Sequence, residues 1–353
     1  MRDLTLLPKA HLHLHFTGSL RVDTLRELGA VRGARLPETL LDGTALSVPA
    51  DRRGWFRFQR NYDLARAVVQ GEATIRRVVR EAAQDDAAEG SRRLELQVDP
   101  TSYAAALGGI TPALEIVLDE ARAASSATGV QVSVIVATSR TRHPLDARTL
   151  ARLAVKHAGT GSGEVCGFGL SNDERSGDTA DWASAFTIAR RAGLPTMPHG
   201  GELLGPDHVR EIVAHLGPTR LGHGVRAVED PRLLEHLVSD GIAFEVCPAS
   251  NVQLGVYPDP AAVPLRTLVD AGATVALGAD DPLLFLSRLT DQYRIARDVL
   301  GFDDAGLAHL ARSSIRASQA TDAEKSRWIA EVDAWLAAPD PGPDAAPEPG
   351  PTG

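Results

Sequence analysis

The chain has few cysteines, few lysines and few aromatic residues. Its 353 residues include two cysteines, Cys166 and Cys247, and aromatic residues make up 5% of the sequence. Two cysteines cannot form a disulfide framework, so we expect both to be buried thiols within strands. The lysines are Lys9, Lys156 and Lys325, and none of them lies at the end of a predicted strand where a lysine-based site would need it.

Long apolar runs and an excess of positive charge are also missing. No uninterrupted apolar run approaches the roughly 18 residues of a membrane-spanning helix, and the first residues lack the apolar core of a secretory signal. The formal net charge of −9 argues against a nucleic-acid groove, because phosphate binding needs clustered Lys and Arg. We therefore expect a cytoplasmic protein with neither membrane nor nucleic-acid partners.

An alternation of histidine and leucine stands near the start, from His11 to His15. Period two is the strand period, so it predicts three imidazoles on one face and two leucines on the other. Strand residues rise about 3.3 Å each, so two neighbouring imidazoles can share one ion while all three cannot. We expect His13 and His15 to bind metal, with His11 one layer deeper. The alternative is a solvated edge strand.

Short apolar segments then alternate with helix-like segments along most of the chain. Alternation of this kind implies a parallel sheet, and eight strands suit a closed (β/α)8 TIM barrel, with an open doubly wound sheet as the alternative. Neither nucleotide-phosphate loop, G-x-G-x-x-G or G-x-x-x-x-G-K-[ST], follows any of these strands. The predicted strands lie near residues 9–16, 93–100, 130–137, 165–170, 194–199, 220–224, 242–248 and 274–282.

The remaining segments complete the predicted architecture. We expect a helical insertion after the first strand. It begins with helical spacing over residues 20–28, and residues from about 31 to 70 are irregular, apart from an aromatic cluster at 52–62. That cluster is either a loop or short-helix lid over a pocket or a helix face packed on the barrel. Helices from 283 to 336 close the barrel. We expect one domain over residues 1–338 and a disordered Pro- and Gly-rich tail over 339–353.

Several predicted strands end in groups that can titrate or bind metal. Carboxyl ends of barrel strands meet at one rim, which is where barrel enzymes carry out chemistry. Singly, such residues are more often structural, but their joint occurrence on one rim is hard to obtain as packing. They are His13 and His15 from the first strand, His199 and Glu202 from the fifth, His223 from the sixth, and Asp280 and Asp281 from the eighth.

Three imidazoles and one carboxylate are the ligands of a catalytic zinc ion with one position left for water. We predict one Zn²⁺ per chain, held by His13, His15, His199 and Asp280. The other three groups are then free to transfer protons, to orient water and to contact a substrate; they are Glu202, His223 and Asp281.

These residues resemble, in order, the motifs of the adenosine deaminase family within the amidohydrolase superfamily. The matches run from residue 8 to about 285, and together they are highly specific. The matching motifs are Lys9, His13, His15 and Gly18; His199, Gly201 and Glu202; Gly222-His223-Gly224; Cys247-Pro248-Ala249-Ser250; and Asp280-Asp281-Pro282.

The resemblance implies a zinc-dependent barrel hydrolase that converts adenosine or 2′-deoxyadenosine to inosine or 2′-deoxyinosine and ammonia. By the same resemblance, Glu202 protonates purine N1, and His223 orients and deprotonates the attacking water. Asp280 binds metal and positions water, and Asp281 contacts N7. A backbone N–H in the loop from Gly169 to Glu174, with Asn172 inside it, meets purine N3. The other zinc deaminase signature, H-x-E with P-C-x-x-C, is absent.

Two positions depart from the classical family pattern. Thr17 stands where an Asp contacts the ribose 5′-hydroxyl, and His11 stands where a Glu is usual. Alternative substrates are therefore aminodeoxyfutalosine, adenine, or an N6- or 5′-modified adenosine. Two other classes stay open: another amidohydrolase reaction, such as amide hydrolysis with a carboxylated lysine and two metals, and a metal-stabilised nucleoside-binding protein without catalysis.

Overall fold

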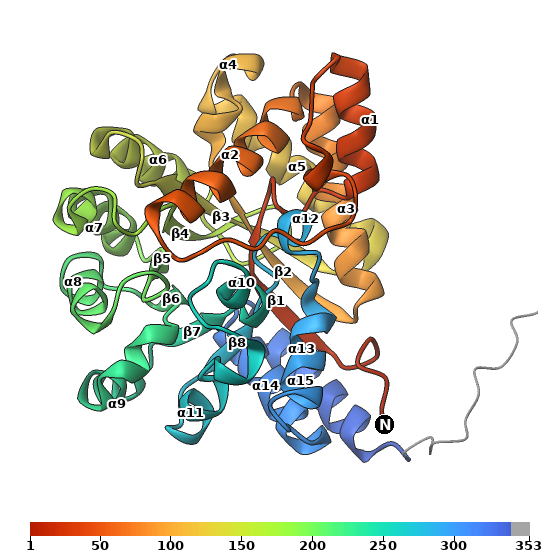
Figure 1. Ribbon diagram of the computed structural model, residues 1–353, viewed down its shortest axis with the longest axis vertical. Helices are drawn as coiled ribbons and strands as arrows, with labels where there is room; N and C mark the ends of the chain where they lie inside the picture. Colours follow the sequence, from red (N-terminus) through yellow and green to blue (C-terminus); the bar gives the residue numbers. More distant parts are fainter. Residues whose placement is uncertain (340–353) are drawn as a thin grey trace, which may run out of the picture.

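Eight parallel strands pair in chain order, β1 to β8, at the centre of the molecule. The computed structural model describes residues 1–339 (Figure 1). A Leu14–Asp280 bridge joins the end of β1 to the segment after β8, which closes the sheet and confirms the predicted barrel. The strands are β1 (Lys9–His15), β2 (Ser91–Val98), β3 (Gln131–Ser139), β4 (Val165–Ser171), β5 (Thr196–Gly200), β6 (Arg220–His223), β7 (Ala243–Val246) and β8 (Val275–Leu277).

Helices surround the strands, as Figure 1 shows. Those that alternate with the strands are α3 (Glu72–Ala88), α5 (Ile110–Thr128), α6 (Pro144–Lys156), α7 (Ala183–Arg191), α8 (Pro206–Leu216), α9 (Pro231–Ser239) and α11 (Leu265–Asp270). After β8 come α12 (Pro282–Phe285), α13 (Leu289–Asp298), α14 (Asp304–Ala317) and α15 (Asp322–Ala337), the predicted C-terminal helices. Shorter connections hold α4 (Ala104–Leu107) and α10 (Pro248–Gln253), and α1 (Val22–Arg32) opens the insertion after β1.

The insertion is more regular than its sequence predicted. Residues 52–68 form the 17-residue helix α2 (Arg52–Val68), which begins where the Asp51 carboxylate accepts the Gly54 N–H at 2.7 Å. The aromatic cluster supplies one face of this helix, because Trp55, Phe58 and Tyr62 recur at helical spacing. The Phe58 ring stacks on Phe285 of α12, with centroids 5.7 Å apart. The irregular segment therefore ends near residue 51.

The prediction that His11 shares a face with His13 is wrong. His11 pairs with Leu94 and Leu14 with Leu96, so three steps along β1 match two along β2. This bulge shifts the alternation by one residue. His11 therefore faces the helical layer, where Nδ1 lies 2.9 Å from Asp86 Oδ1 of α3 and Nε2 accepts the Ala279 N–H.

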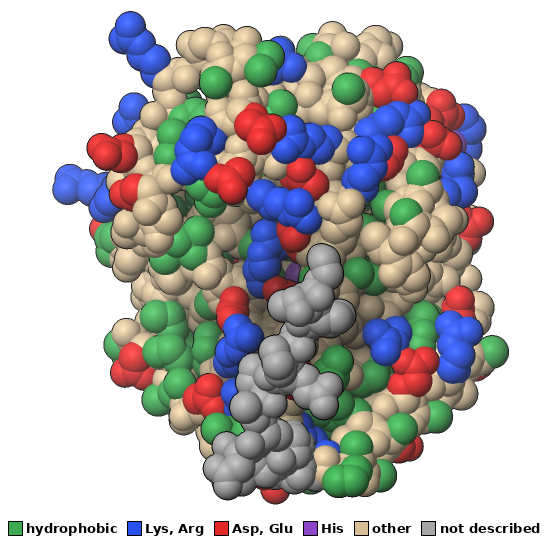
Figure 2. Space-filling model, turned by 90° about the vertical axis from the view of Figure 1, so that its right-hand side faces the viewer, with side chains coloured by type: hydrophobic (Ala, Val, Ile, Leu, Met, Phe, Trp, Pro, Cys, Tyr) green, Lys and Arg blue, Asp and Glu red, His purple; other side chains and the backbone are tan. Residues whose placement is uncertain are grey.

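Charged side chains lie in both the interior and the surface of the molecule. On the face drawn in Figure 2, basic and acidic side chains intermingle.

Within residues 1–339, no helix has both the length and the apolar composition needed to cross a membrane. Both cysteines are buried free thiols, Cys166 in β4 and Cys247 one residue past β7. The predicted disordered tail lies outside the described residues from 340 onward.

Candidate metal centre and active site

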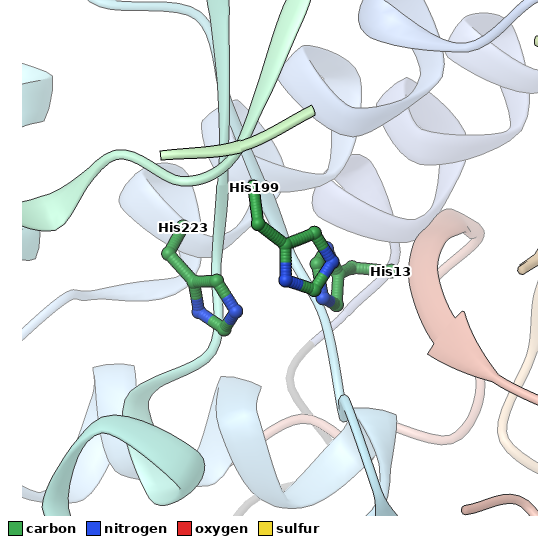
Figure 3. Close-up of side chains that lie close together, drawn as sticks. All are labelled: His13, His199 and His223. Atoms are coloured by element: carbon green, nitrogen blue, oxygen red, sulfur yellow. The ribbon is translucent and has the colours of Figure 1, made fainter. Parts of the chain in front are cut away.

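Four imidazoles and one carboxylate from four parts of the barrel meet at the carboxyl ends of its strands. His15 Nε2 lies 3.2 Å from Asp280 Oδ1, and His13 Nε2 lies 3.6 Å from the same oxygen. The ring centroid of His13 is 4.8 Å from that of His199 and 4.7 Å from that of His223. Figure 3 shows these three rings drawn together from separate strands. The predicted ligand residues and His223 therefore occupy one site.

The donor set fits a metal ion. His13 Nε2 is buried without a hydrogen-bond partner, although buried polar atoms are normally paired. It points to a group of ligand atoms that lie within 4.8 Å of one another, in the sets His13–His199–His223 and His13–His15–Asp280. Imidazole nitrogens with one carboxylate are the zinc ligands of catalytic sites. A cation at this point would supply the partner that His13 lacks.

Cys247 completes a third set of nearby ligand atoms, with His223 and Asp280. Burial and the carboxylates of Asp280 and Glu245 raise the pKa of its thiol well above the usual range. A metal binds the thiolate and not the thiol, so binding at Cys247 would require this proton to be displaced.

The electrostatics differ from ring to ring. Burial opposes a charge on His13, but the carboxylates of Asp280 and Glu245 outweigh burial and raise the pKa of His13 from 6.5 to about 10. Burial and the neighbouring His13 lower the pKa of His199 well below its usual value, and they lower that of His223 to about 3. Burial raises the pKa of Asp280, but the nearby His13 and His15 rings outweigh burial and hold that pKa well below its ordinary value. Neutral imidazole and ionised carboxylate are the forms that bind metal.

Strained backbone presents two of these groups to the site. His223 and Asp280 have φ of 68° and 63°, in the left-handed region that costs a non-glycine residue about 1 kcal/mol or more. A Cβ on Gly222 would lie 2.7 Å from His199 Cδ2 and 3.1 Å from His13 Cε1. This glycine therefore makes room for the imidazoles themselves.

A chain of buried charged side chains, here called the ladder, holds the Nδ1 side of the His13 ring. It consists of Glu245, Arg220, Glu95 and Arg93. Glu245 Oε2 lies 2.7 Å from His13 Nδ1, and Glu245 Oε1 accepts Arg220 Nε at 2.6 Å. Arg220 Nη2 donates to Glu95 Oε2 at 2.6 Å, and Glu95 Oε1 accepts Arg93 Nε at 2.6 Å. All are at most 1% exposed. A carboxylate behind a ligand histidine fixes its ring and tautomer, so Glu245 directs Nε2 of His13 into the site.

Sequence reasoning missed this support and that of Ser250. The Ser250 hydroxyl donates to Asp280 Oδ2 at 2.5 Å, which leaves Oδ1 toward His13 and His15. A usable signal existed for Glu245, because a charge inside the apolar run Ile242–Val246 implies a buried partner. The sequence does not say which strand supplies that partner.

Glu202 and Asp281 lie beside the ligand cluster. Both are 2% exposed, and Glu202 Oε1 lies 3.6 Å from His223 Nε2. Burial and the charge of Asp280 raise the pKa of both carboxyls well above their usual range. Asp281 Oδ1 is buried without a partner. The shift favours the protonated form of the Glu202 carboxyl, and Asp281 presents an oxygen that no other group satisfies.

A pocket opens above this cluster, and α2 forms one of its walls. Its floor holds the imidazoles of His15, His199 and His223 with Gln97, Glu202, Asp280 and Asp281. Its outer part is mixed aromatic and polar. The residues there include Trp55, Phe58, Gln59, Tyr62, Arg66, Asp99, Ser102, Tyr103, Ser139, Ser171, Asn172 and Leu254. The aromatic cluster therefore both packs as a helix face and covers the pocket.

The predicted substrate-binding residues divide into two groups. His15, Asn172 and Asp281 line the pocket. Thr17 and Gly169 are not among its lining residues. Thr17 is fully buried behind Tyr103, and its hydroxyl lies 2.6 Å from the Tyr103 hydroxyl. Gly169 lies within β4, where it pairs with Met197 of β5.

Lys9 lies at the other end of β1. Its Nζ donates to the carbonyls of Leu4 and Leu7, each at 2.8 Å, and to that of Glu89 at 2.5 Å. The structure therefore brings no lysine from this motif to the ligand cluster, where a carboxylated lysine would bridge two metals.

An eight-stranded α/β barrel with histidine and aspartate side chains clustered at the carboxyl ends of its strands defines a protein of the amidohydrolase fold. Comparison with known proteins narrows this class. The family model described as adenosine deaminase matches residues 8–335. The chain belongs to the adenosine deaminase family.

Relatives and solved structures agree with this assignment. A Streptomyces virginiae protein with a provisional adenosine/adenine deaminase name is 58% identical over 336 residues, covering 95% of this chain and 98% of its own. The adenine deaminase of Rhizobium leguminosarum bv. trifolii is 32% identical, covering 92% and 99%. The crystal structure of adenine deaminase from Arthrobacter aurescens superposes with a TM-score of 0.85 at 28% identity, covering 94% and 100%. An amidohydrolase from Burkholderia ambifaria, solved with bound zinc, shares the fold at a TM-score of 0.80 and 24% identity, covering 94% and 92%.

Proposed function

We propose that this protein catalyses the zinc-dependent hydrolysis of adenosine or 2′-deoxyadenosine to inosine or 2′-deoxyinosine and ammonia. The observation that carries the proposal is the meeting of three imidazoles, Asp280 and a buried Glu202 on the floor of one pocket, with the buried ring of His13 against them. A module that only bound nucleosides would have no need for a buried acid and a neutral imidazole side by side. Membership of the adenosine deaminase family supports the same reaction.

The residues that would hold the zinc ion are His13, His15, His199 and Asp280. When bound, zinc acts as a Lewis acid that lowers the pKa of water toward neutrality. The protein supplies the geometry: Glu245 orients His13 and Ser250 orients Asp280.

Proton transfer falls to Glu202 and His223. The raised pKa of Glu202 favours the protonated carboxyl, which can donate its proton to purine N1 as water adds at C6. The lowered pKa of His223, about 3, keeps its ring neutral, so it can accept a proton from that water. The C6 amino group then takes the proton held by His223 and leaves as ammonia, and the C6 hydroxyl returns a proton to Glu202 to form the carbonyl.

The pocket wall supplies purine contacts. Asp281 faces the pocket with an unpaired oxygen, which suits a ring nitrogen such as N7. Ser171 and Asn172 line the side formed by β4 and the loop after it. The outer end is polar, with Arg66, Asp99 and other hydrogen-bonding groups, and such groups suit the hydroxyls of a sugar.

Adenine is the second candidate substrate, and Thr17 favours it. The side chain at this position is fully buried and bonded to Tyr103, so it does not reach the pocket where a ribose 5′-hydroxyl would lie. A free base needs no contact there. Relatives named adenine deaminase at 32% identity over most of the chain support this candidate.

A substrate panel tests the proposal. Zinc-loaded protein is mixed with adenosine, 2′-deoxyadenosine, adenine and 5′-modified adenosines, and loss of the 6-amino chromophore is followed by absorbance. We expect turnover of at least one of them, with one zinc per chain by elemental analysis. No turnover of any 6-aminopurine by zinc-loaded protein would reject the proposal. A content of two metals per chain would favour the alternative of amide hydrolysis.

A further inference from the structure

A single carboxylate from the loop after β4 holds the loop after β5. Glu174 Oε1 accepts the backbone N–H of Glu202 at 3.0 Å, and Glu174 Oε2 accepts those of Leu203 and Leu204 at 2.9 and 2.8 Å. Consecutive N–H groups of this kind form a concavity that binds an anion. Here the anion is the Glu174 side chain, which is 2% exposed.

The far side of Glu174 is closed by polar side chains. His208 Nδ1 lies 3.8 Å from Glu174 Oε2, and Arg140 Nη2 lies 3.4 Å from His208 Nε2. Both residues are buried. Because water has little access to Glu174, nothing else in the site can satisfy the three N–H groups if the carboxylate is removed.

The loop that carries Glu174 also touches the pocket. Its residues Ser171 and Asn172 line the wall, and Asn172 has a φ of 80°. Arg175 Nη1 donates to the carbonyl of Ala50 at 3.2 Å, just before α2 begins. One loop therefore joins the pocket wall, the approach to α2 and the segment that bears Glu202.

We infer that Glu174 is a positioning residue for Glu202. The chain reaches residue 202 from β5 through Gly201, whose φ is 76°. The three hydrogen bonds to Glu174 then hold the backbone from residue 202 to residue 204. The Glu202 carboxyl is thereby held 3.6 Å from His223 Nε2. A displacement of about 1 Å at such a group can cost 10²-fold in rate. The inference rests on the proposed function, because it requires Glu202 to carry a proton.

The test compares Glu174→Gln with the wild type as zinc-loaded, full-length protein. Glutamine keeps the shape but replaces one acceptor oxygen with an NH2 that faces backbone donors. We expect amide hydrogen exchange of the peptide covering 202–204 to be at least about tenfold faster. With adenosine and adenine as substrates, we expect kcat to fall about 10- to 100-fold, KM to stay within about threefold and zinc content to be unchanged.

Glu235→Gln, the same change at an exposed residue of α9, is the matched control and should behave as the wild type. If Glu174→Gln does not fold, Glu174→Asp, which withdraws the carboxylate by one methylene, should show the same fall in kcat with little change in KM. An active wild type whose Glu174 variants keep kcat within twofold overturns this inference alone, as does a fall in kcat that only follows loss of zinc. A wild type that deaminates no 6-aminopurine overturns the proposed function and the inference together.

Discussion

Replacing Glu245 by glutamine tests the support of the metal centre. The wild-type carboxylate uses one oxygen for Arg220 Nε at 2.6 Å and the other for His13 Nδ1 at 2.7 Å. Glutamine offers one acceptor oxygen, so it can serve Arg220 or His13 but not both. Its NH2 must then face a donor in a region where the Glu245 and Arg220 side chains are at most 1% exposed. We expect both stability and zinc affinity to fall.

The two effects can be sized separately. Removing one partner of a buried ion pair costs about 3–5 kcal/mol. Arg220 keeps its contact with Glu95 at 2.6 Å and with the carbonyl of Ala317 at 3.0 Å, so we expect the free energy of unfolding to fall by the lower value, about 3 kcal/mol. Loss of the group that orients a ligand histidine weakens metal binding about 10- to 100-fold.

Urea unfolding of the metal-free protein measures the first effect, and competition with a chromophoric chelator measures the second. Glu331→Gln is the control, because it breaks the half-exposed pair with Arg92 and should cost less than about 1 kcal/mol. A Glu245→Gln variant with wild-type zinc affinity would show that Glu245 does not hold the His13 ring. If the Glu245→Gln variant also had wild-type stability, the reasoning about the ladder would be refuted.

Three further predictions follow from the same residues. Glu202→Gln should lower kcat by about 10²–10⁴-fold with unchanged zinc content, and full activity in this variant would exclude Glu202 as the acid. His13→Ala should lose zinc and melt at a lower temperature, because metal binding is linked to folding; elemental analysis showing one zinc per chain would remove His13 from the site. Burial raises the pKa of Glu95, but Arg220 and Arg93 outweigh burial and lower it from 4.5 to about 2. The resulting stabilisation of about 3 kcal/mol is present above pH 4.5 and is lost as pH falls toward 2. In acid unfolding curves, Glu95→Gln should therefore flatten this part of the pH dependence, and an unchanged slope would contradict the assignment.

Period and spacing were sufficient to predict the barrel and the cluster at its rim. Each strand is short and apolar and is followed by a helical pattern, so its end can be located within a few residues. Carboxyl ends of parallel strands share one rim, and this places His13, His199 and Asp280 together without any knowledge of side-chain contacts. The sequence left two alternatives for residues 52–62, a lid or a packed helix face, because the polar residues of α2 partly hide the aromatic face that recurs at Trp55, Phe58 and Tyr62. The helix α2 (Arg52–Val68) provides both.

What the sequence could not predict depends on contacts between distant strands or on a local irregularity. The bulge in β1 turns His11 away from the site, and nothing in the alternation of His and Leu marks it. Glu245 and Arg220 look like isolated charges in apolar strands until β6 and β7 lie side by side. Glu174 stands 28 residues before Glu202 in the chain, and only the turn after β5 aims three N–H groups at it.

Stability alone does not explain why charged residues occupy these positions, and the geometry of His13 does. A buried ion pair is often no more stabilising than an apolar pair of the same volume. An apolar pair at Arg220 and Glu245, however, would leave His13 Nδ1 without an acceptor and its ring free to turn. The ladder also extends to a backbone group, because Glu95 Oε1 accepts the Gln319 N–H at 2.7 Å. The position of the His13 imidazole is thus tied, through the three charged residues Glu245, Arg220 and Glu95, to the segment between α14 and α15. Changes near Gln319 should therefore reach the candidate metal centre without touching it.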